Sequence, residues 1–318
     1  MTKISIAYAP DTNFIPLTLV SMASVLKNAD ADDEIEFVIM HAGLEDKYLK
    51  VFDNLQNIKN YKLRCLKVDK NLFVDFPCPN WVTLEAWFRC LLADLLPDMD
   101  KILYLDCDTI VRKSLKDLFN IKLGDNLVGV IEDVSQSKQK AQNIGLKDNF
   151  YFNSGVMYIN LEAWRKVRFF DCLKKIVADD QKISNDQDAL NKASEGRKLR
   201  LSPSYDYMQV WWRSNNPEYD EAYAAEFERI ADDPTIVHFT GVKPNHPDCR
   251  NKFKGEYLDY SKLVSGYEQL QSEIGIKKAG KGREKKVWWR RLFGIEYSTD
   301  RRHRYIDLFG FTIKQKIG

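Results

Sequence analysis

The sequence predicts an α/β fold in which a mostly parallel, twisted sheet is covered by helices on both faces. Two observations lead to this class. Short apolar runs that read as strands alternate with segments of helical spacing, an order typical of parallel sheets with right-handed crossovers. Some of these runs are nearly continuously apolar, as strands buried on both faces are. At 318 residues the chain can form one large domain of this class or two smaller ones.

The first half of the chain supplies the alternating elements in order. Pro10 ends a buried strand over 4–9, and the segment 14–28 has apolar residues at helical spacing. We expect further strands at 34–40, 62–68 and 101–105, helices at 45–56 and 83–96, and a proline-rich loop around 76–79. This order favours a mononucleotide-binding topology. Because the chain has no Gly-x-Gly-x-x-Gly or Walker sequence, a nucleotide would be held without a glycine-rich phosphate loop.

The second half continues with strands at 127–132, 153–160 and 236–237, and with helices that begin near 161 and 185. Polar side chains crowd the segment 185–191, a pattern typical of helix capping. Trp211 and Trp212 lie in a loop-rich region, where they either wall a binding pocket or belong to the core.

Two carboxylates stand one residue apart where the strand 101–105 ends. Ligands of open α/β sheets bind outside the carboxyl ends of the strands, and alternate residues of an extended chain share a face, so Asp106 and Asp108 can point at one object. Close carboxylates repel unless a cation or a proton lies between them. Hard oxygen ligands suit Mg²⁺ or Mn²⁺. The spacing therefore indicates a metal site, with a solvated acidic turn as the alternative.

A third candidate ligand follows the strand at 236–237. His238 ends that strand, Gly241 permits a tight loop and Lys243 follows. Imidazole binds transition metals well and Mg²⁺ poorly, so two aspartates with one histidine favour Mn²⁺ over Mg²⁺. Lys243 can neutralise a departing diphosphate. A purely structural histidine is the alternative.

These motifs occur in a specific order. It runs Tyr8-Ala-Pro-Asp11-Thr-Asn13-Phe, Arg89, Tyr104-Leu-Asp106-Cys-Asp108, Phe152-Asn153-Ser-Gly155-Val, Asp186-Gln187-Asp188, His238-Phe-Thr-Gly241 and Lys243-Pro244. Over residues 3 to about 260 the chain thus resembles glycosyltransferase family 8, the retaining galactosyl- and glucosyltransferases of bacterial lipopolysaccharide and capsule synthesis, with glycogenin as a relative. The resemblance implies a GT-A catalytic domain over 1–275 that binds a UDP-sugar with Mn²⁺ at the diphosphate.

The resemblance also implies a role for each motif residue. It makes Asp106, Asp108 and His238 the metal ligands, with Asp106 also contacting the donor. It places uridine contacts at Ala9, Asp11 and Asn13, diphosphate contacts at Gly241 and Lys243, and donor-sugar contacts at Arg89, Asp133, Asn153, Asp186 and Gln187.

The implied activity is transfer of galactose or glucose from the UDP-sugar to a hydroxyl of a glycan acceptor, with the α configuration retained. Retaining glycosidases use a carboxylate nucleophile, but the family position opposite the sugar is here the amide Gln187. We therefore expect same-face attack, with covalent attack by Asp186 or Asp188 as the alternative. A metal-dependent nucleotidyltransferase is a second alternative, although the segment 8–13 lacks the basic residues expected for triphosphate binding.

Charge is unevenly distributed along the chain. Residues 276–318, here called the basic tail, hold 13 Lys/Arg and 4 Asp/Glu, so they carry +9 while the whole chain carries +2. Its first part, 277–286, reads as a flexible linker, and Trp288-Trp289 beside Arg290-Arg291 suits a lipid headgroup region. We expect this tail to bind an anionic membrane surface. Packing of the aromatics on the globule, or nucleic-acid binding by the tail, is the alternative; the acidic body argues against nucleic acid.

The remaining features concern the compartment. The six cysteines have no metal spacing and are expected to be free thiols. The N-terminus leads straight into a strand pattern, and no run approaches the roughly 18 apolar residues that span a bilayer. We expect a cytoplasmic protein, peripheral on the inner face of the cell membrane.

Overall fold

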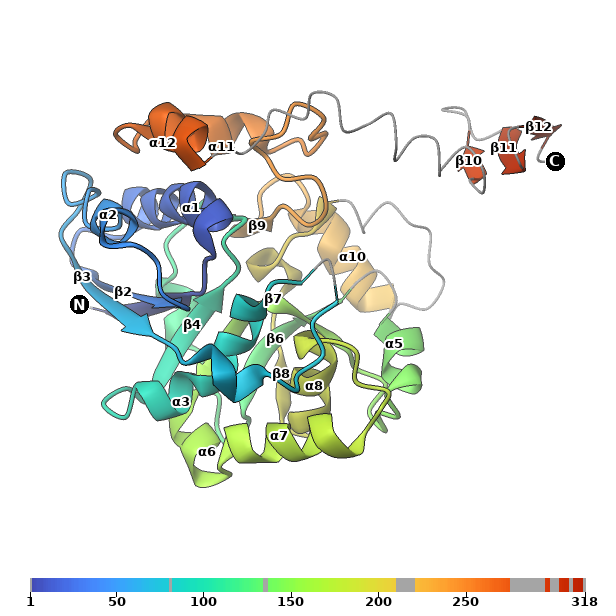
Figure 1. Ribbon diagram of the computed structural model, residues 1–318, viewed down its shortest axis with the longest axis horizontal. Helices are drawn as coiled ribbons and strands as arrows, with labels where there is room; N and C mark the ends of the chain where they lie inside the picture. The colour runs from blue at the N-terminus through green and yellow to red at the C-terminus, as the bar shows by residue number, and fades with distance from the viewer. Residues whose placement is uncertain are drawn as a thin grey trace. The chain divides into compact units, whose positions relative to one another are not determined.

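The computed structural model divides the chain into two compact units, residues 1–274 and 275–318 (Figure 1). It describes residues 2–79, 82–133, 137–209 and 221–274 of the first unit, and 295–297, 303–308 and 311–316 of the second. Trp211 and Trp212, the linker 277–286 and Trp288-Trp289 lie outside the described residues.

The first unit alternates strands and helices. Its strands are β1 (Lys3–Tyr8), β2 (Glu34–His41), β3 (Tyr61–Lys67), β4 (Lys101–Leu105), β5 (Thr109–Val111), β6 (Val128–Glu132), β7 (Phe152–Asn160), β8 (Lys198–Arg200) and β9 (Ile236–His238). Its α-helices are α1 (Ile15–Asn28), α2 (Asp46–Val51), α3 (Leu92–Leu95), α4 (Lys116–Asn120), α5 (Ser137–Asn143), α6 (Leu161–Lys166), α7 (Phe169–Asp179), α8 (Asp186–Ala193), α10 (Glu221–Ile230), α11 (Lys254–Ser261) and α12 (Tyr267–Ile274). Short 3₁₀ helices are η1 (Thr12–Phe14), η2 (Lys70–Phe73), η3 (Leu84–Leu91) and η4 (Pro203–Tyr205).

Seven of these strands form one sheet in the order β3-β2-β1-β4-β7-β6-β8. The pairs β2/β3, β1/β2, β1/β4 and β6/β8 are parallel, whereas β7 runs antiparallel to both of its neighbours. The chain builds outward from β1 to β2 and β3 on one side and returns to place β4 on the other. The mostly parallel α/β sheet predicted from the sequence is therefore confirmed, and the carboxyl ends of β1 and β4 lie where the strand order reverses.

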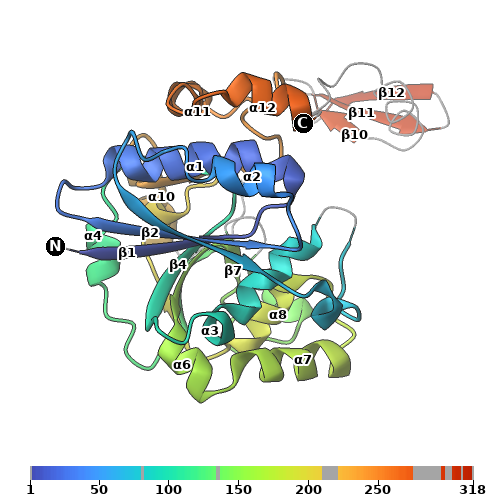
Figure 2. The same cartoon turned by 60° about the vertical axis from the view of Figure 1, so that its left-hand side comes forward.

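Helices cover both faces of the sheet (Figure 2). One layer holds α1 and α2, with α11 packed on α1, and the opposite layer holds α3, α6, α7 and α8. Side chains of β1 alternate between the two cores: Ile4, Ile6 and Tyr8 belong to the first, Ala7 to the second. The central strands are thus buried on both faces, as their nearly continuous apolar sequence predicted.

Two predicted helices differ from those observed. The helix expected over 45–56 ends at Val51 and continues as turns. The segment expected as a helix over 83–96 is mostly the 3₁₀ helix η3, followed by the single α turn α3. Within η3 the Arg89 side chain donates from Nε to the Ala86 carbonyl at 2.7 Å, so a functional side chain takes up part of the local backbone bonding.

A second, two-stranded sheet pairs β5 with β9, and Thr109 lies opposite His238. The sequence predicted β9 but not β5, which has three residues only. This small antiparallel pair matters because it places the end of β9 beside the chain that leaves β4.

The second unit is described only in its backbone. Three strands, β10 (Ile295–Tyr297), β11 (His303–Leu308) and β12 (Phe311–Lys316), form an antiparallel sheet in that order. No strand was predicted here, because basic and aromatic residues, rather than an apolar period, dominate the sequence.

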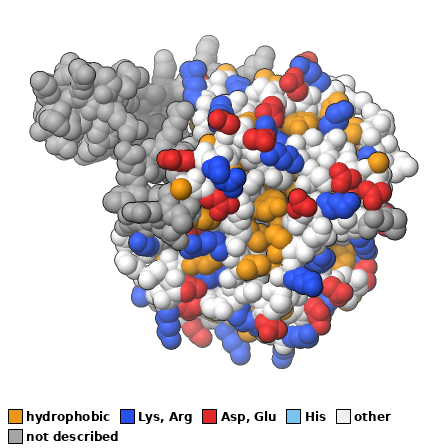
Figure 3. Space-filling view, turned by 180° about the vertical axis from the view of Figure 1, so that it is seen from behind, with side chains coloured by type: hydrophobic (Ala, Val, Ile, Leu, Met, Phe, Trp, Pro, Cys, Tyr) orange, Lys and Arg blue, Asp and Glu red, His pale blue; other side chains and the backbone are white. Residues whose placement is uncertain are grey.

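The surface of the first unit carries mixed charges. On the face shown in Figure 3, acidic and basic side chains are interspersed around hydrophobic side chains near its centre. No helix in the described part of the chain combines the length and the apolar character that crossing a membrane requires.

Candidate active site

An open cavity of about 570 Å³ is lined by residues that follow the carboxyl ends of β1 and β4. The chain leaving β1 contributes Ala9, the chain leaving β4 contributes Asp106 and Asp108, and β7 contributes Asn153. The predicted residues that line the cavity are Ala9, Arg89, Asp106, Asp108, Asn153, Asp186, Gln187, Asp188, His238, Gly241 and Lys243. Eleven of the predicted site residues, which lie far apart in the sequence, therefore line one cavity.

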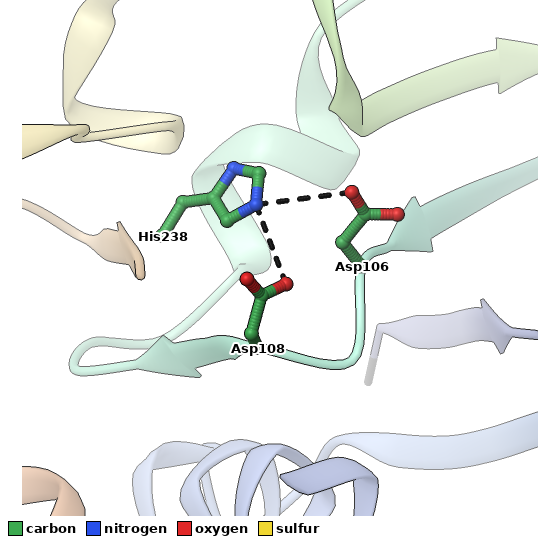
Figure 4. A group of neighbouring side chains, drawn as sticks. All are labelled: Asp106, Asp108 and His238. Carbon is green, nitrogen blue, oxygen red and sulfur yellow. Dashed lines mark ion pairs between the residues drawn. The ribbon is translucent and has the colours of Figure 1, made fainter. Parts of the chain in front are cut away.

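Three of the residues that line this cavity are the predicted metal ligands, and their side chains point toward one another (Figure 4). One ligand atom from each of Asp106, Asp108 and His238 lies within 4.8 Å of the others. His238 Nε2 is 3.4 Å from Asp108 Oδ1 and 3.8 Å from Asp106 Oδ2. Asp108 and His238 are buried, and the Asp106 side chain is 30% exposed. All three line the cavity, and Asp106 is the most exposed of them.

Backbone hydrogen bonds hold these three residues in place independently of any ion. The Asp106 N–H donates to the Gly155 carbonyl at 2.7 Å, which ties the end of β4 to β7. The Phe239 N–H donates to the Asp108 carbonyl at 2.9 Å, which ties the aspartate to the end of β9. The ligands are preorganised, because each lies at a strand end whose backbone bonds are already made.

Gly155 leaves the space in which the three ligands meet. A Cβ added at this position would lie 2.2 Å from His238 Cε1 and 2.8 Å from Asp106 Oδ2. Both separations are far below van der Waals contact, so any larger residue would displace the histidine or the aspartate.

Opposite charges surround the ligands. Lys243 Nζ donates to Asp108 Oδ2, and His238 Nδ1 is 3.0 Å from Asp206 Oδ1. Burial of Asp108 opposes its ionisation, but the charges of Lys243 and His238 outweigh burial and lower the pKa of its carboxyl. Burial likewise opposes a charged His238, and Asp108 with Asp206 overcomes it and raises the pKa of the ring. Both carboxylates of the Asp-x-Asp pair thus lie beside basic side chains, Asp108 beside Lys243 and Asp106 beside Arg89.

Arg89 is the buried cation that links the metal end of the cavity to α8. Only 3% exposed, it places Nη2 3.2 Å from Asp106 Oδ1 and 3.4 Å from Asp186 Oδ2, and Nη1 donates to the Ser154 carbonyl. Its guanidinium stacks on the Tyr104 ring at 4.1 Å. Burial raises the pKa of the Asp186 carboxyl, while the charge of Arg89 opposes that rise.

Gln187 projects from the first turn of α8, and both ends of its amide are bonded within the protein. Oε1 accepts from the Ser154 N–H at 2.9 Å, and Nε2 donates to Asp133 Oδ2 at 3.1 Å. The same Asp133 oxygen accepts from Lys140 Nζ at 2.7 Å. These contacts fix the orientation of the amide at the cavity wall.

Asp188 is fully engaged in the local structure. One oxygen accepts from the Tyr151 hydroxyl, and the other accepts from the Ser184 N–H at 3.0 Å and its hydroxyl at 2.6 Å. At the start of the same helix, Asn185 accepts from the Asp188 N–H at 2.9 Å. The capping predicted from this polar run is therefore confirmed for Asn185.

Three predicted residues are not among those that line the cavity. Asp11 caps η1 by accepting from the Phe14 N–H at 3.0 Å, and Asn13 donates to Asp11 at 3.4 Å. Asp133 lies behind Gln187 and is buried, so it reaches the cavity through that amide and through Lys140. Phe14, which lines the cavity, was not predicted.

Several further residues of the site were missed. Lys140, Lys182, Ser184 and Asn185 line the end of the cavity near α8, and Asp206 supports His238 from behind. Ser184 and Asn185 precede a predicted helix and were interpretable as capping residues. The lysines and Asp206 belong to no motif, and only the tertiary structure brings them to the site.

The residues present fit a divalent metal ion. Two carboxylates and one imidazole form a donor set suited to Mn²⁺, the glycine opposite them keeps the space open, and a carboxylate supports the histidine on its far side. We therefore regard Asp106, Asp108 and His238 as the residues that would hold such an ion.

Comparisons with known proteins identify the family of the chain. The family model described as glycosyl transferase family 8 matches residues 5–248. The lipopolysaccharide 1,2-glucosyltransferase of Escherichia coli is 27% identical over 283 residues, which cover 86% of this chain and 82% of that protein. General stress protein A of Bacillus subtilis (strain 168) is 24% identical over 74% of this chain and 85% of its own.

Solved structures of known proteins have a similar fold. The galactosyltransferase LgtC, crystallised in complex with donor and acceptor sugar analogs, matches with a TM-score of 0.74 and 28% identity, over 82% of this chain and 96% of that one. An active-site mutant of the same enzyme matches with a TM-score of 0.75. The GT-A fold expected from the sequence is thereby confirmed, and the chain belongs to glycosyl transferase family 8.

Proposed function

We propose that this glycosyltransferase moves galactose or glucose from a UDP-sugar to a hydroxyl of a glycan acceptor, with retention of configuration and with Mn²⁺ as its cofactor. One observation carries the proposal: a cluster of Asp106, Asp108 and His238 opens into the same cavity as Arg89, Asp186 and Gln187. The first group suits a metal–diphosphate, and the second offers charged and amide groups to the hydroxyls of a sugar.

The residues around the cluster would act on the diphosphate. Bound by Asp106, Asp108 and His238, the ion would supply positive charge to stabilise the diphosphate as it leaves. Lys243 lies beside Asp108 and has the charge to pair with a phosphate oxygen. Ala9 and Phe14, near the end of β1, offer apolar surface for the nucleoside.

Retention of configuration is best explained by attack on the same face of the sugar. Asp188 has both oxygens occupied by Tyr151 and Ser184, and Asp186 is buried beside Arg89, so neither is presented as a free nucleophile. In same-face attack the bond from the anomeric carbon to the acceptor oxygen forms as its bond to the phosphate oxygen breaks. The departing phosphate oxygen takes the acceptor proton, and Gln187 positions the sugar.

The acceptor would bind at the end of the cavity lined by Lys140, Lys182, Ser184 and Asn185. Amide, hydroxyl and ammonium groups there provide hydrogen bonds for sugar hydroxyls. The E. coli relative is described as a lipopolysaccharide 1,2-glucosyltransferase, so we propose lipopolysaccharide, lipooligosaccharide or a capsular glycan as the acceptor class.

We further propose that residues 1–275 are the catalytic domain and that the basic tail holds the enzyme on the inner face of the cell membrane. The net charge of +9 in residues 276–318 supports this, since each Lys or Arg near an anionic leaflet contributes about 1 kcal/mol. An acceptor linked to lipid would then lie near the active site.

A donor screen tests the proposed function. UDP-galactose and UDP-glucose are incubated with the protein, an acceptor oligosaccharide from lipopolysaccharide, and either Mn²⁺ or a chelator, and the released UDP and the product anomer are measured. We expect UDP release and an α-linked product with Mn²⁺ only.

A matched pair of variants serves as the control for this screen. Asp106→Asn should abolish transfer, whereas Asp100→Asn, at the other end of β4 with its side chain 85% exposed, should not. Absence of UDP release from either donor, or equal activity of the two variants, would contradict the proposal.

A further inference from the structure

Asp206 is a buried carboxylate that the proposed chemistry does not use. It is 0% exposed and follows η4, in a part of the sequence that carries no motif. Its Oδ1 lies 3.0 Å from His238 Nδ1, and its Oδ2 has no hydrogen-bond partner. Among the described residues, His238 is thus the hydrogen-bond partner of the Asp206 carboxylate.

Backbone hydrogen bonds deliver Asp206 to this position. The Tyr207 N–H donates to the Ile236 carbonyl and the His238 N–H donates to the Tyr207 carbonyl, both at 3.0 Å. Tyr207 forms a parallel bridge to Val237, so the chain after η4 runs alongside β9. Asp206 and His238 are therefore held on adjacent, hydrogen-bonded segments, which bring their side chains within reach of each other.

The contact determines which nitrogen of His238 is available to a cation. A proton on Nδ1 is retained because Asp206 accepts it, so Nε2 is the nitrogen that can offer a lone pair. Nε2 faces Asp108 at 3.4 Å and Asp106 at 3.8 Å. A half-turn of the ring would place Nε2 elsewhere and break the bond to Asp206.

From this geometry we propose that Asp206 is a positioning residue of the metal site, which holds His238 in the orientation and protonation that bind a divalent cation. A charged carboxylate at 0% exposure with one partner is costly if it only supports the fold. It would be useful when Nε2 binds a divalent ion, because a carboxylate that accepts from Nδ1–H holds the ring in place and makes it a stronger ligand. The inference rests on the proposed metal site and deepens it.

Binding of Mn²⁺ alone, followed by the electron paramagnetic resonance of the free ion, tests this without any assay of activity. Asp206→Ala should raise the Kd for Mn²⁺ by about 10- to 100-fold, the range expected for loss of an outer partner of a ligand. Asp206→Asn keeps an oxygen that can accept from Nδ1 but removes the charge, so a smaller rise is expected.

Ser204→Ala is the matched control. Ser204 lies two residues before Asp206 on the same segment and bonds Thr235 at 2.9 Å and 3.0 Å, away from the ligand atoms. It should change thermal stability without changing the Kd for Mn²⁺. If Asp206→Ala does not fold, Asp206→Asn decides.

Two outcomes would overturn the proposal. If a folded Asp206 variant binds Mn²⁺ with the Kd of the unmodified protein, Asp206 plays no part in the site, while the proposed transferase stands. If the unmodified protein binds no Mn²⁺, both this inference and the metal dependence of the proposed function are wrong.

Discussion

The Ser154 backbone N–H donates a 2.9 Å hydrogen bond to Oε1 of Gln187. Since Ser154 lies on β7 and Gln187 on α8, this bond fixes an amide of the helix against the central sheet. The NH₂ end of the amide is then directed to Asp133. An amide held at both ends has a fixed orientation, and its NH₂ group has a second N–H that can donate to a sugar hydroxyl, so it is suited to position a sugar rather than to attack it.

Replacing Gln187 tests that role. Gln187→Ala should lower turnover about 100-fold, since loss of precise positioning costs rates of this order. The product should remain α-linked, as measured by NMR, and mass spectrometry of the intact protein should find no attached hexose. Gln142→Ala, an exposed amide on α5, should retain normal turnover. A hexose bound to Asp186 or Asp188 would show that a covalent intermediate forms instead.

A methyl group at Gly155 should destroy the metal site. Gly155→Ala would place Cβ 2.2 Å from His238 Cε1. We therefore expect the variant to lose Mn²⁺ binding and the activity that depends on it. We also expect its free energy of unfolding to fall by about 1–3 kcal/mol, as for other overpacked positions. Gly255→Ala, where nothing lies within 4 Å of the added carbon, should be neutral or stabilise α11 by up to about 1 kcal/mol. Normal Mn²⁺ binding by Gly155→Ala would refute the assigned ligand positions.

Removal of the buried charge of Arg89 should destabilise the fold as well as the site. Arg89→Met removes the cation that is paired with the buried Asp186, and loss of one partner of a buried pair costs about 3–5 kcal/mol. Urea unfolding measures this. The double variant Arg89→Met, Asp186→Asn should recover part of the loss, because the unpaired charge is gone.

Arg168→Met is the comparison for that measurement. Arg168 is 81% exposed and pairs with Asp171 at the surface, so its loss should cost less than about 1 kcal/mol. Equal stability of the Arg89 and Arg168 variants would mean that the buried pair contributes little.

The parts of this site that follow from local sequence were predictable. Asp106 and Asp108 directly follow a buried strand, and the strand period and topology together place them at the carboxyl edge of the sheet. His238 was predicted on the same grounds, at the end of β9. In each case one short segment holds both the structural signal and the functional residue.

The parts that depend on tertiary pairing were not predictable. Asp206 reaches His238 because Tyr207 forms a bridge to Val237. Nothing in the sequence of the segment 202–206 predicts that pairing. The apolar run of β7 predicted a strand but not its antiparallel direction, since direction depends on which neighbours it joins. Arg89 was expected on an α-helix, yet its own bond to Ala86 accompanies a 3₁₀ helix.

Truncation after residue 275 should separate catalysis from membrane binding. The described residues that form the two apolar cores all precede residue 275, so the first unit should fold without the basic tail. We expect residues 1–275 to keep activity on a soluble acceptor and to lose sedimentation with anionic vesicles. The full chain should sediment with such vesicles at low salt, less at high salt because the charges are screened, and little with neutral vesicles. Equal sedimentation of the two proteins with anionic vesicles would exclude the tail as the membrane contact, and loss of activity on the soluble acceptor would instead assign the tail a role in the catalytic domain.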